Sequence, residues 1–122
     1  MALPILVADD SALARKLLIH ALPENWNVSV SEAKNGAEAL AAYHAGQASV
    51  MFLDLTMPVM TGFEVLDELH RVDANLVVIV VSADVQLGAK DRVKAAGAAA
   101  FVEKPVSREK LEPILRELGL YA

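Results

Sequence analysis

Residues 50–62 read VMFLDLTMPVMTG, and this stretch decides which fold we expect. Its first four residues form an uninterrupted apolar run that ends directly at the carboxylate of Asp54. A short apolar run bounded by turn residues is typical of a strand that is buried on both faces of a sheet. A loop containing Pro58 and Gly62 then separates Asp54 from the next helical pattern. The stretch therefore predicts a strand that carries an acidic side chain to the edge of a sheet.

The same alternation of apolar runs and helical patterns extends along the whole chain. Four further apolar stretches predict strands at residues 3–8, 27–31, 76–81 and 99–102. Apolar residues at three- and four-residue spacing predict helices at residues 11–22, 37–45, 63–72, 85–96 and 107–118. Asn35-Gly36 predicts a turn before the second helix, and Gly88 is expected to cost the fourth helix about 1 kcal/mol relative to alanine. The pattern is a βα unit repeated five times.

This alternation predicts an α/β domain with a parallel sheet and helices on both faces. Because the crossover connections are right-handed, the C-terminal ends of all the strands lie along one edge of the sheet. Open sheets of this kind bind their ligands at that edge. We therefore expect one domain over residues 1–122, with its functional site at the C-terminal edge of the sheet.

Composition excludes several classes of function. The 122 residues include no cysteine, which excludes disulfides, thiol catalysis and zinc–thiolate sites. The net charge of −5 argues against a nucleic-acid-binding surface. No apolar run is long enough to span a membrane, and the first residues do not resemble a signal peptide. We expect a soluble, cytoplasmic domain that binds neither nucleic acid nor membrane directly.

Charged and hydroxyl side chains follow four of the five predicted strands. They are Asp9 and Asp10 after the first, Asp54 after the third, Ser82 after the fourth and Lys104 after the fifth. Each could by itself be a helix cap or a solvated surface charge, except Asp54, which does not precede a helix directly. The second strand offers only Ser31 and Glu32, to which no role is assigned.

Taken together, three carboxylates at one edge predict a cation site. Clustered carboxylates repel one another and are driven toward protonation unless a cation neutralises them. Oxygen ligands without sulfur favour a hard ion such as Mg²⁺, which combines one or two carboxylates with phosphate and water oxygens. Lys104 and the Ser82 hydroxyl are suited to phosphoryl oxygens. The set predicts phosphoryl transfer in which Asp54 is the nucleophile and forms an acyl phosphate.

Four segments, in this order, resemble the receiver domain of two-component response regulators. They read VADDSALARKLL, MFLDLTMPVMTGFEVL, VVIVVSA and AAFVEKPVSREKL, and the resemblance covers essentially the whole chain. It implies a flavodoxin-like fold, which is a (βα)5 three-layer sandwich with a five-stranded parallel sheet in the order 2-1-3-4-5. It also implies a phosphoprotein of two-component signalling or of a phosphorelay.

The resemblance implies that Asp54 is the phosphoacceptor. The phosphoryl group would come from a phosphohistidine on a sensor histidine kinase or a phosphotransfer protein, in a Mg²⁺-dependent reaction. Asp10 and Asp54 would ligate the metal directly and Asp9 chiefly through water. The main-chain carbonyl of Thr56 would be the third protein ligand, and Lys104 would pair with Asp54 at rest and with a phosphoryl oxygen afterwards. Such a domain catalyses its own phosphorylation and dephosphorylation but does not turn over an external substrate.

The resemblance further implies a conformational switch. Ser82 matches the family's Ser/Thr switch position and Phe101 its aromatic switch. New charge at Asp54 would draw the Ser82 hydroxyl inward and vacate volume that Phe101 can fill. The surface of the fourth helix, fifth strand and fifth helix would then change shape for a downstream effector protein or domain. Further positions shape the loop or tune the phosphoryl lifetime, namely Met57, Pro58, Gly62, Ala83, Asp84 and Pro105, whose preceding peptide is often cis in this family.

Other functions fit the residues less well. A haloacid-dehalogenase-type phosphatase needs a second aspartate where Thr56 stands. An FMN carrier needs a glycine- and hydroxyl-rich loop where residues 9–11 read Asp-Asp-Ser. A phosphorylation-independent pseudo-receiver, serving only as a docking module, usually lacks an acidic residue or the lysine. The receiver part of a longer multidomain regulator is a further alternative.

Overall fold

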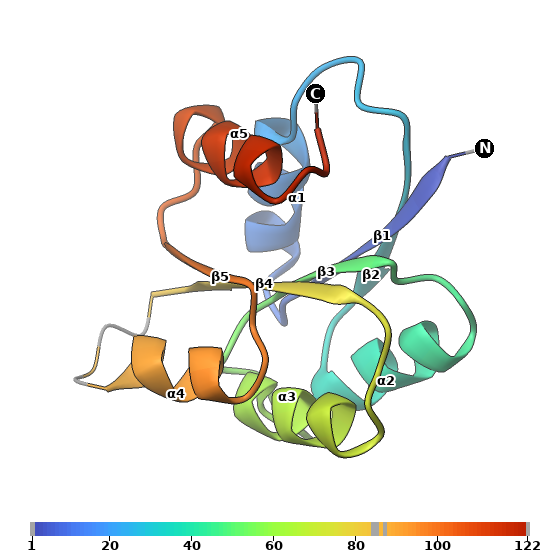
Figure 1. Ribbon diagram of the computed structural model, residues 1–122, viewed down its shortest axis with the longest axis vertical. Coiled ribbons are helices and arrows are strands. Elements are labelled where there is room, and N and C mark those ends of the chain that lie inside the picture. The colour runs from blue at the N-terminus through green and yellow to red at the C-terminus, as the bar shows by residue number, and fades with distance from the viewer. Residues whose placement is uncertain (1, 84–85, 87, 122) are drawn as a thin grey trace.

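The structure is a computed structural model that describes residues 2–83, 86 and 88–121. Strands and helices alternate along it as the sequence predicts (Figure 1). The strands are β1 (Leu3–Ala8), β2 (Val28–Ala33), β3 (Val50–Leu53), β4 (Val77–Ser82) and β5 (Ala100–Glu103). The helices are α1 (Ala12–Ala21), α2 (Gly36–His44), α3 (Gly62–Arg71), α4 (Ala89–Ala95) and α5 (Arg108–Glu117).

The strands form one five-stranded parallel sheet in the order β2-β1-β3-β4-β5. Helices α1 and α5 cover one face of the sheet, and α2, α3 and α4 cover the other (Figure 1). The predicted three-layer fold and strand order are therefore confirmed. Between the central strands, Ala8 pairs with Leu53, so that the residues following β1 and β3 emerge next to each other.

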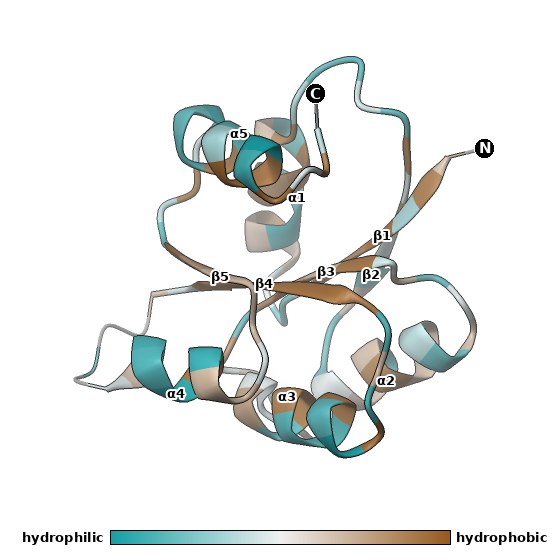
Figure 2. Ribbon diagram, in the orientation of Figure 1, coloured by the Kyte–Doolittle hydropathy of each residue, from teal (hydrophilic) through white to brown (hydrophobic). Residues whose placement is uncertain are grey.

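Each face of the sheet carries its own apolar core. Ile5 and Phe52 belong to the core under α1 and α5, whereas Leu6 and Met51 belong to the core under α2, α3 and α4. Successive residues of a strand point to opposite faces, so the central strands must be apolar at every position. Figure 2 shows hydrophobic strands between helices whose outer surfaces are hydrophilic. Within the described residues, every helix is too short or too polar to cross a lipid bilayer.

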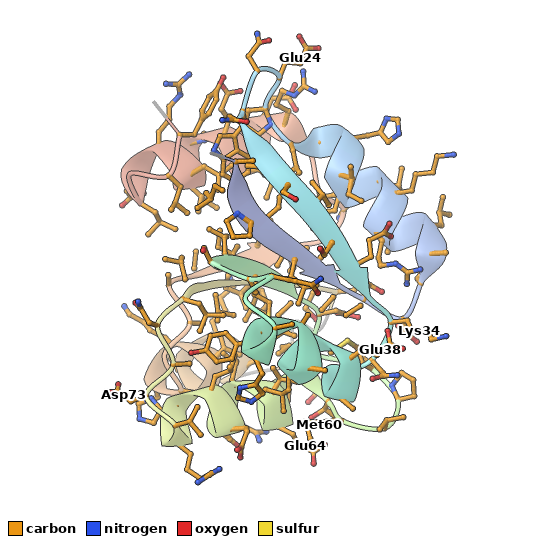
Figure 3. All side chains as sticks on the ribbon, turned by 90° about the vertical axis from the view of Figure 1, so that its right-hand side faces the viewer. Glu24, Lys34, Glu38, Met60, Glu64 and Asp73 are labelled. Carbon is orange, nitrogen blue, oxygen red and sulfur yellow. The ribbon has the colours of Figure 1, made fainter. Side chains whose placement is uncertain are left out.

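Helix α2 begins earlier than predicted. Asn35 and Gly36 do not form a separate turn, because Gly36 is already the first helical residue. The Asn35 side chain caps the helix by accepting a hydrogen bond from the Glu38 amide at 2.8 Å. The Glu38 carboxylate in turn accepts from the Lys34 amide at 3.1 Å, and Figure 3 labels both residues at this end of α2. The cap therefore couples the end of β2 directly to the helix.

Helix α4 begins later than predicted. The expected helix over residues 85–96 includes positions outside the described residues, and the helix itself starts at Ala89. Gly88 precedes it with a φ of 88°, in the left-handed region that glycine adopts without strain. The expected cost of Gly88 inside a helix is therefore wrong. Gly97, with a φ of 103°, follows the end of α4.

Candidate functional site

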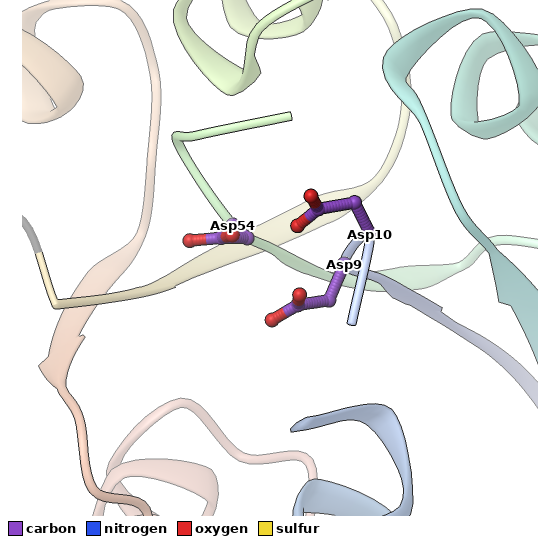
Figure 4. A group of neighbouring side chains, drawn as sticks. All are labelled: Asp9, Asp10 and Asp54. Atoms are coloured by element: carbon purple, nitrogen blue, oxygen red, sulfur yellow. The ribbon is translucent and has the colours of Figure 1, made fainter. Parts of the chain in front are cut away.

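Three carboxylates lie together at the C-terminal edge of the sheet (Figure 4). One carboxylate oxygen each from Asp9, Asp10 and Asp54 lies within 4.8 Å of the others. Main-chain hydrogen bonds extend the sheet to these positions, because the Asp9 amide donates to the Ala33 carbonyl and the Asp54 amide to the Ala8 carbonyl, each at 3.0 Å. Asp9 and Asp54 are buried, whereas Asp10 is exposed. The predicted acidic cluster therefore forms.

Burial raises the pKa of the Asp54 carboxyl above its ordinary value. The neighbouring carboxylate of Asp9 raises this pKa further. Lys104 and the main-chain amides of Leu55 and Thr56 act in the opposite direction, with the Leu55 amide donating to Asp54 Oδ1 at 2.9 Å, but they do not cancel the rise. Negative charge at the site is thus incompletely compensated by the protein, which is the condition that favours a bound cation.

The raised pKa predicts that ionised Asp54 destabilises the fold. Between the ordinary pKa of aspartate and the raised value, the folded protein binds more protons than the unfolded chain. The stabilisation from protonated Asp54 is complete below that window and is lost as the pH rises through it. We expect the unfolding free energy of wild type, measured by urea in Mg²⁺-free buffer, to fall relative to Asp54→Asn across the window. A difference that does not vary with pH would contradict this.

Lys104 lies between two of the carboxylates. Its Nζ is 2.7 Å from Oδ2 of Asp9 and 3.8 Å from Oδ1 of Asp54. The Lys104 amide donates to the Ser82 carbonyl at 2.9 Å, which anchors this connection to the end of β4. The peptide between Lys104 and Pro105 is cis. The sequence expectation paired Lys104 with Asp54, and the structure adds Asp9 as the nearer partner.

The two predicted switch residues lie on neighbouring strands. Ser82 is the last residue of β4 and is only 1% exposed. Phe101 lies on β5, is half-buried and packs against the core on the α2–α4 face. The Lys90 ammonium of α4 lies 5.6 Å from the centroid of its ring. Ala83 is exposed, and Asp84 lies outside the described residues.

The loop after Asp54 alternates between core and solvent. Met57 is buried in the core on the α2–α4 face, whereas Thr56 and Pro58 are exposed. The loop ends in a capping box, in which the Thr61 hydroxyl accepts from the Glu64 amide at 3.2 Å and the Glu64 carboxylate accepts from the Thr61 amide at 3.0 Å. Figure 3 shows Glu64 at this end of α3. The loop is therefore fixed where it enters α3.

Gly62 lets α3 begin directly against the end of β3, beside Asp54. Its amide donates to the Leu55 carbonyl at 3.0 Å. A Cβ atom on Gly62 would clash with the main-chain oxygen of Asp54 and would lie 2.7 Å from the Leu55 Cα. Because both neighbours are backbone atoms, no side-chain movement could relieve this contact. A glycine is required here by close approach.

A cavity of about 570 Å³ opens beside Asp54 on the face covered by α1 and α5. Asp9, Asp54 and Lys104 form its polar end. Its apolar lining includes Ala14, Leu17, Leu18, Phe52, Val81 and Val106. This volume lies in the range of small-molecule sites, so a group larger than phosphate has room next to the Asp54 carboxylate.

Arg15 and Glu32 also reach the site, and the sequence did not point to either. Arg15 Nη1 donates to the main-chain oxygen of Asp9 at 2.6 Å, and Arg15 Nε donates to Glu32 Oε1 at 2.8 Å. The two side chains are 17 positions apart and come from α1 and β2. Only the packing of the helix on the edge of the sheet brings them together, so no local spacing could have found them.

Comparisons with known proteins agree with this geometry. A family model described as response regulator receiver domain matches residues 5–116. The chemotaxis protein CheY of Bacillus subtilis is 35% identical over 120 residues, covering 98% of this chain and all of that protein. A protein-glutamate methylesterase/protein-glutamine glutaminase of Geobacillus kaustophilus is 40% identical over 104 residues, which are 83% of this chain and 30% of that protein. The solved CheX–CheY–BeF3–Mg complex from Borrelia burgdorferi matches with a TM-score of 0.85 and 28% identity, covering 96% of this chain and 89% of that one.

Proposed function

Since the chain belongs to the family of response regulator receiver domains, we propose that Asp54 is its phosphoacceptor. The observation that carries the proposal is a buried carboxylate beside a lysine and two further acids at the C-terminal edge of the sheet. The phosphoryl donor would be a phosphohistidine on a sensor histidine kinase or a phosphotransfer protein. We assign the domain to residues 1–122. A pseudo-receiver is not favoured, because the acids and Lys104 are all present.

In this reaction an oxygen of the Asp54 carboxylate attacks phosphorus. The bond from phosphorus to the donor's imidazole nitrogen breaks, and its electron pair stays on that nitrogen. Lys104 Nζ lies 3.8 Å from Asp54 Oδ1, close enough to bind a phosphoryl oxygen once the group is attached to Asp54.

The donor set fits Mg²⁺, because all three nearby side chains offer carboxylate oxygens within 4.8 Å of one another. Asp10 and Asp54 are the candidates for direct ligation, with the Thr56 carbonyl carried over from the family. Both oxygens of Asp9 already accept protein hydrogen bonds, from the Ser11 amide at 2.9 Å and Lys104 at 2.7 Å, which supports contact through water. When bound, the ion supplies the positive charge that lets Asp54 ionise and the phosphoryl group approach.

The first test is loading of the wild-type chain. A small-molecule phosphodonor such as acetyl phosphate, with Mg²⁺, is expected to add one phosphate, measured by intact-mass spectrometry. The same mixture with excess EDTA is expected to give no adduct, because the carboxylates then lack their counter-ion. A wild-type chain that stays unmodified in Mg²⁺ would contradict the proposal and favour the pseudo-receiver.

Lys104→Ala is expected to be phosphorylated more slowly and to transmit the signal poorly. Losing one charged hydrogen bond to the phosphoryl group predicts a rate roughly 10- to 100-fold lower. Hydrogen exchange of α4 amides, compared before and after loading, is expected to change much less than in wild type. Lys16→Ala, which removes an exposed positive charge from α1, is the matched control. A normal α4 response in Lys104→Ala would contradict its proposed role.

We further propose that the output surface is formed by α4, β5 and α5, where a downstream effector protein or domain would bind. Ser82 is buried at the end of β4, and Phe101 is half-buried on the next strand, in contact with the α2–α4 core. The net charge of −5 supports a protein partner over nucleic acid. A Phe101→Ala variant that loads normally but loses the exchange response of α4 would identify the ring as part of the switch.

A further inference from the structure

Arg15 connects the edge strand β2 with the acidic cluster. Its guanidinium donates to two acceptors, the main-chain oxygen of Asp9 at 2.6 Å and Glu32 Oε1 at 2.8 Å. The Arg15 side chain is 16% exposed, whereas that of Glu32 is 51% exposed. A planar guanidinium presents its donors at fixed angles, so an arginine held at one acceptor is oriented toward the other. Glu32 thereby orients Arg15 at the end of β1.

The oxygen that Arg15 holds belongs to the peptide unit between Asp9 and Asp10. This unit is planar, so the direction of its carbonyl sets the direction in which the chain leaves toward Asp10. The Asp9 side chain has its own contacts with Lys104 and the Ser11 amide. Within the described part of the chain, no hydrogen bond or ion pair holds the Asp10 carboxylate. Its position therefore depends on the backbone that Arg15 fixes.

We propose that Arg15 is a positioning residue for the cation site, and that Glu32 assists it. By holding the Asp9–Asp10 peptide, Arg15 keeps the Asp10 carboxylate within reach of Asp54. The inference rests on the proposed function, because the cation is the Mg²⁺ assigned there. It gives strand β2 a role in the site, through a half-exposed glutamate on the molecular surface.

A charge effect and a positioning effect predict opposite changes in Mg²⁺ affinity when Arg15 is removed. A positive charge next to three carboxylates weakens their attraction for Mg²⁺, so its removal would tighten binding if charge alone mattered. If Arg15 positions Asp10, its removal weakens binding despite the more favourable charge. Groups that orient metal ligands typically contribute 10- to 100-fold to metal affinity. The direction of the change therefore separates the two explanations.

The test is titration calorimetry of Mg²⁺ with the full chain in metal-free buffer. Arg15→Met is expected to weaken Mg²⁺ binding, so that the dissociation constant rises by roughly tenfold. Arg15→Lys keeps the charge but lacks the planar fork that presents one nitrogen to Asp9 and another to Glu32, and it is expected to weaken binding by a similar factor. Glu32→Gln is expected to have a smaller effect in the same direction. Arg116→Met, which breaks the ion pair with Glu112 on α5, is the matched control and is expected to leave the affinity unchanged.

Unchanged or tighter Mg²⁺ binding by Arg15→Met or Arg15→Lys would overturn the inference. Urea unfolding without Mg²⁺ checks that each variant is folded. If Arg15→Met does not fold, Arg15→Lys decides, because a pure charge effect predicts no change for it. If wild type accepts phosphate and binds Mg²⁺ while both Arg15 variants match it, only the inference fails. If wild type binds no Mg²⁺, the assigned cation fails and the inference fails with it.

Discussion

Asp54→Asn is expected to accept no phosphoryl group and yet to be more stable than wild type. A carboxamide is not a nucleophile for phosphorus, so the mass adduct seen in wild type disappears entirely. The same change removes a buried carboxylate whose pKa is raised by desolvation and by Asp9, so the unfolding free energy at neutral pH increases. Intact-mass spectrometry and urea unfolding in Mg²⁺-free buffer measure the two effects on the same sample.

The Asp54→Asn variant is informative because its phosphorylation is expected to be lost while its unfolding free energy increases. Loss of phosphorylation through misfolding would be accompanied by lower stability, so the gain in stability excludes that explanation. Asp67→Asn, an exposed position on α3, is the control and is expected to change neither quantity. An adduct retained by Asp54→Asn would place the acceptor on another residue. A less stable variant would show that burial does not disfavour the Asp54 charge.

Gly62→Ala is expected to have the largest effect on stability. The added Cβ meets the main-chain oxygen of Asp54 and the Leu55 Cα, so either α3 or the end of β3 must move. Overpacking of this kind costs about 3 kcal/mol when rigid atoms oppose it. Because the displaced atoms belong to Asp54, the proposed phosphoacceptor, the phosphorylation rate of the folded fraction should also fall. Urea unfolding and initial rates of phosphate loading measure these outcomes.

Gly46→Ala is the control for this substitution. Gly46 follows the end of α2 with a φ of 78°, and nothing lies within 4 Å of the position that its Cβ would take. The change is expected to cost roughly 1 kcal/mol through backbone strain, without altering the phosphorylation rate. Equal effects of the two substitutions on that rate would contradict a specific effect of the contact between Gly62 and the end of β3.

Much of the fold could be predicted because its central strands are buried on both faces. The run Val50–Leu53 is apolar at every position, and the structure places it between β1 and β4, with one core on each side. Such a run is typical of a strand covered on both faces, and parallel strands deliver their C-terminal residues to one edge. The convergence of Asp9, Asp10 and Asp54 follows from this rule, whereas their catalytic roles stay predictions.

The features that could not be predicted depend on contacts between distant elements. Lys104 was expected beside Asp54. Its position relative to Asp9 depends on the path that the chain takes after β5 at the edge of the sheet. The contact between Arg15 and Glu32 depends on where α1 packs. The predicted start of α4 was wrong because the sequence alone does not distinguish a glycine inside a helix from one that directly precedes it. The φ of Gly88 in the structure makes that distinction.

The ion pair between Lys104 and Asp9 joins residues 95 positions apart. A chain still leaving the ribosome would hold the first strand long before this lysine is made, so a partial product that ends before residue 104 lacks this ion pair. The complete cluster therefore forms only after both β1 and the segment that follows β5 have been synthesised.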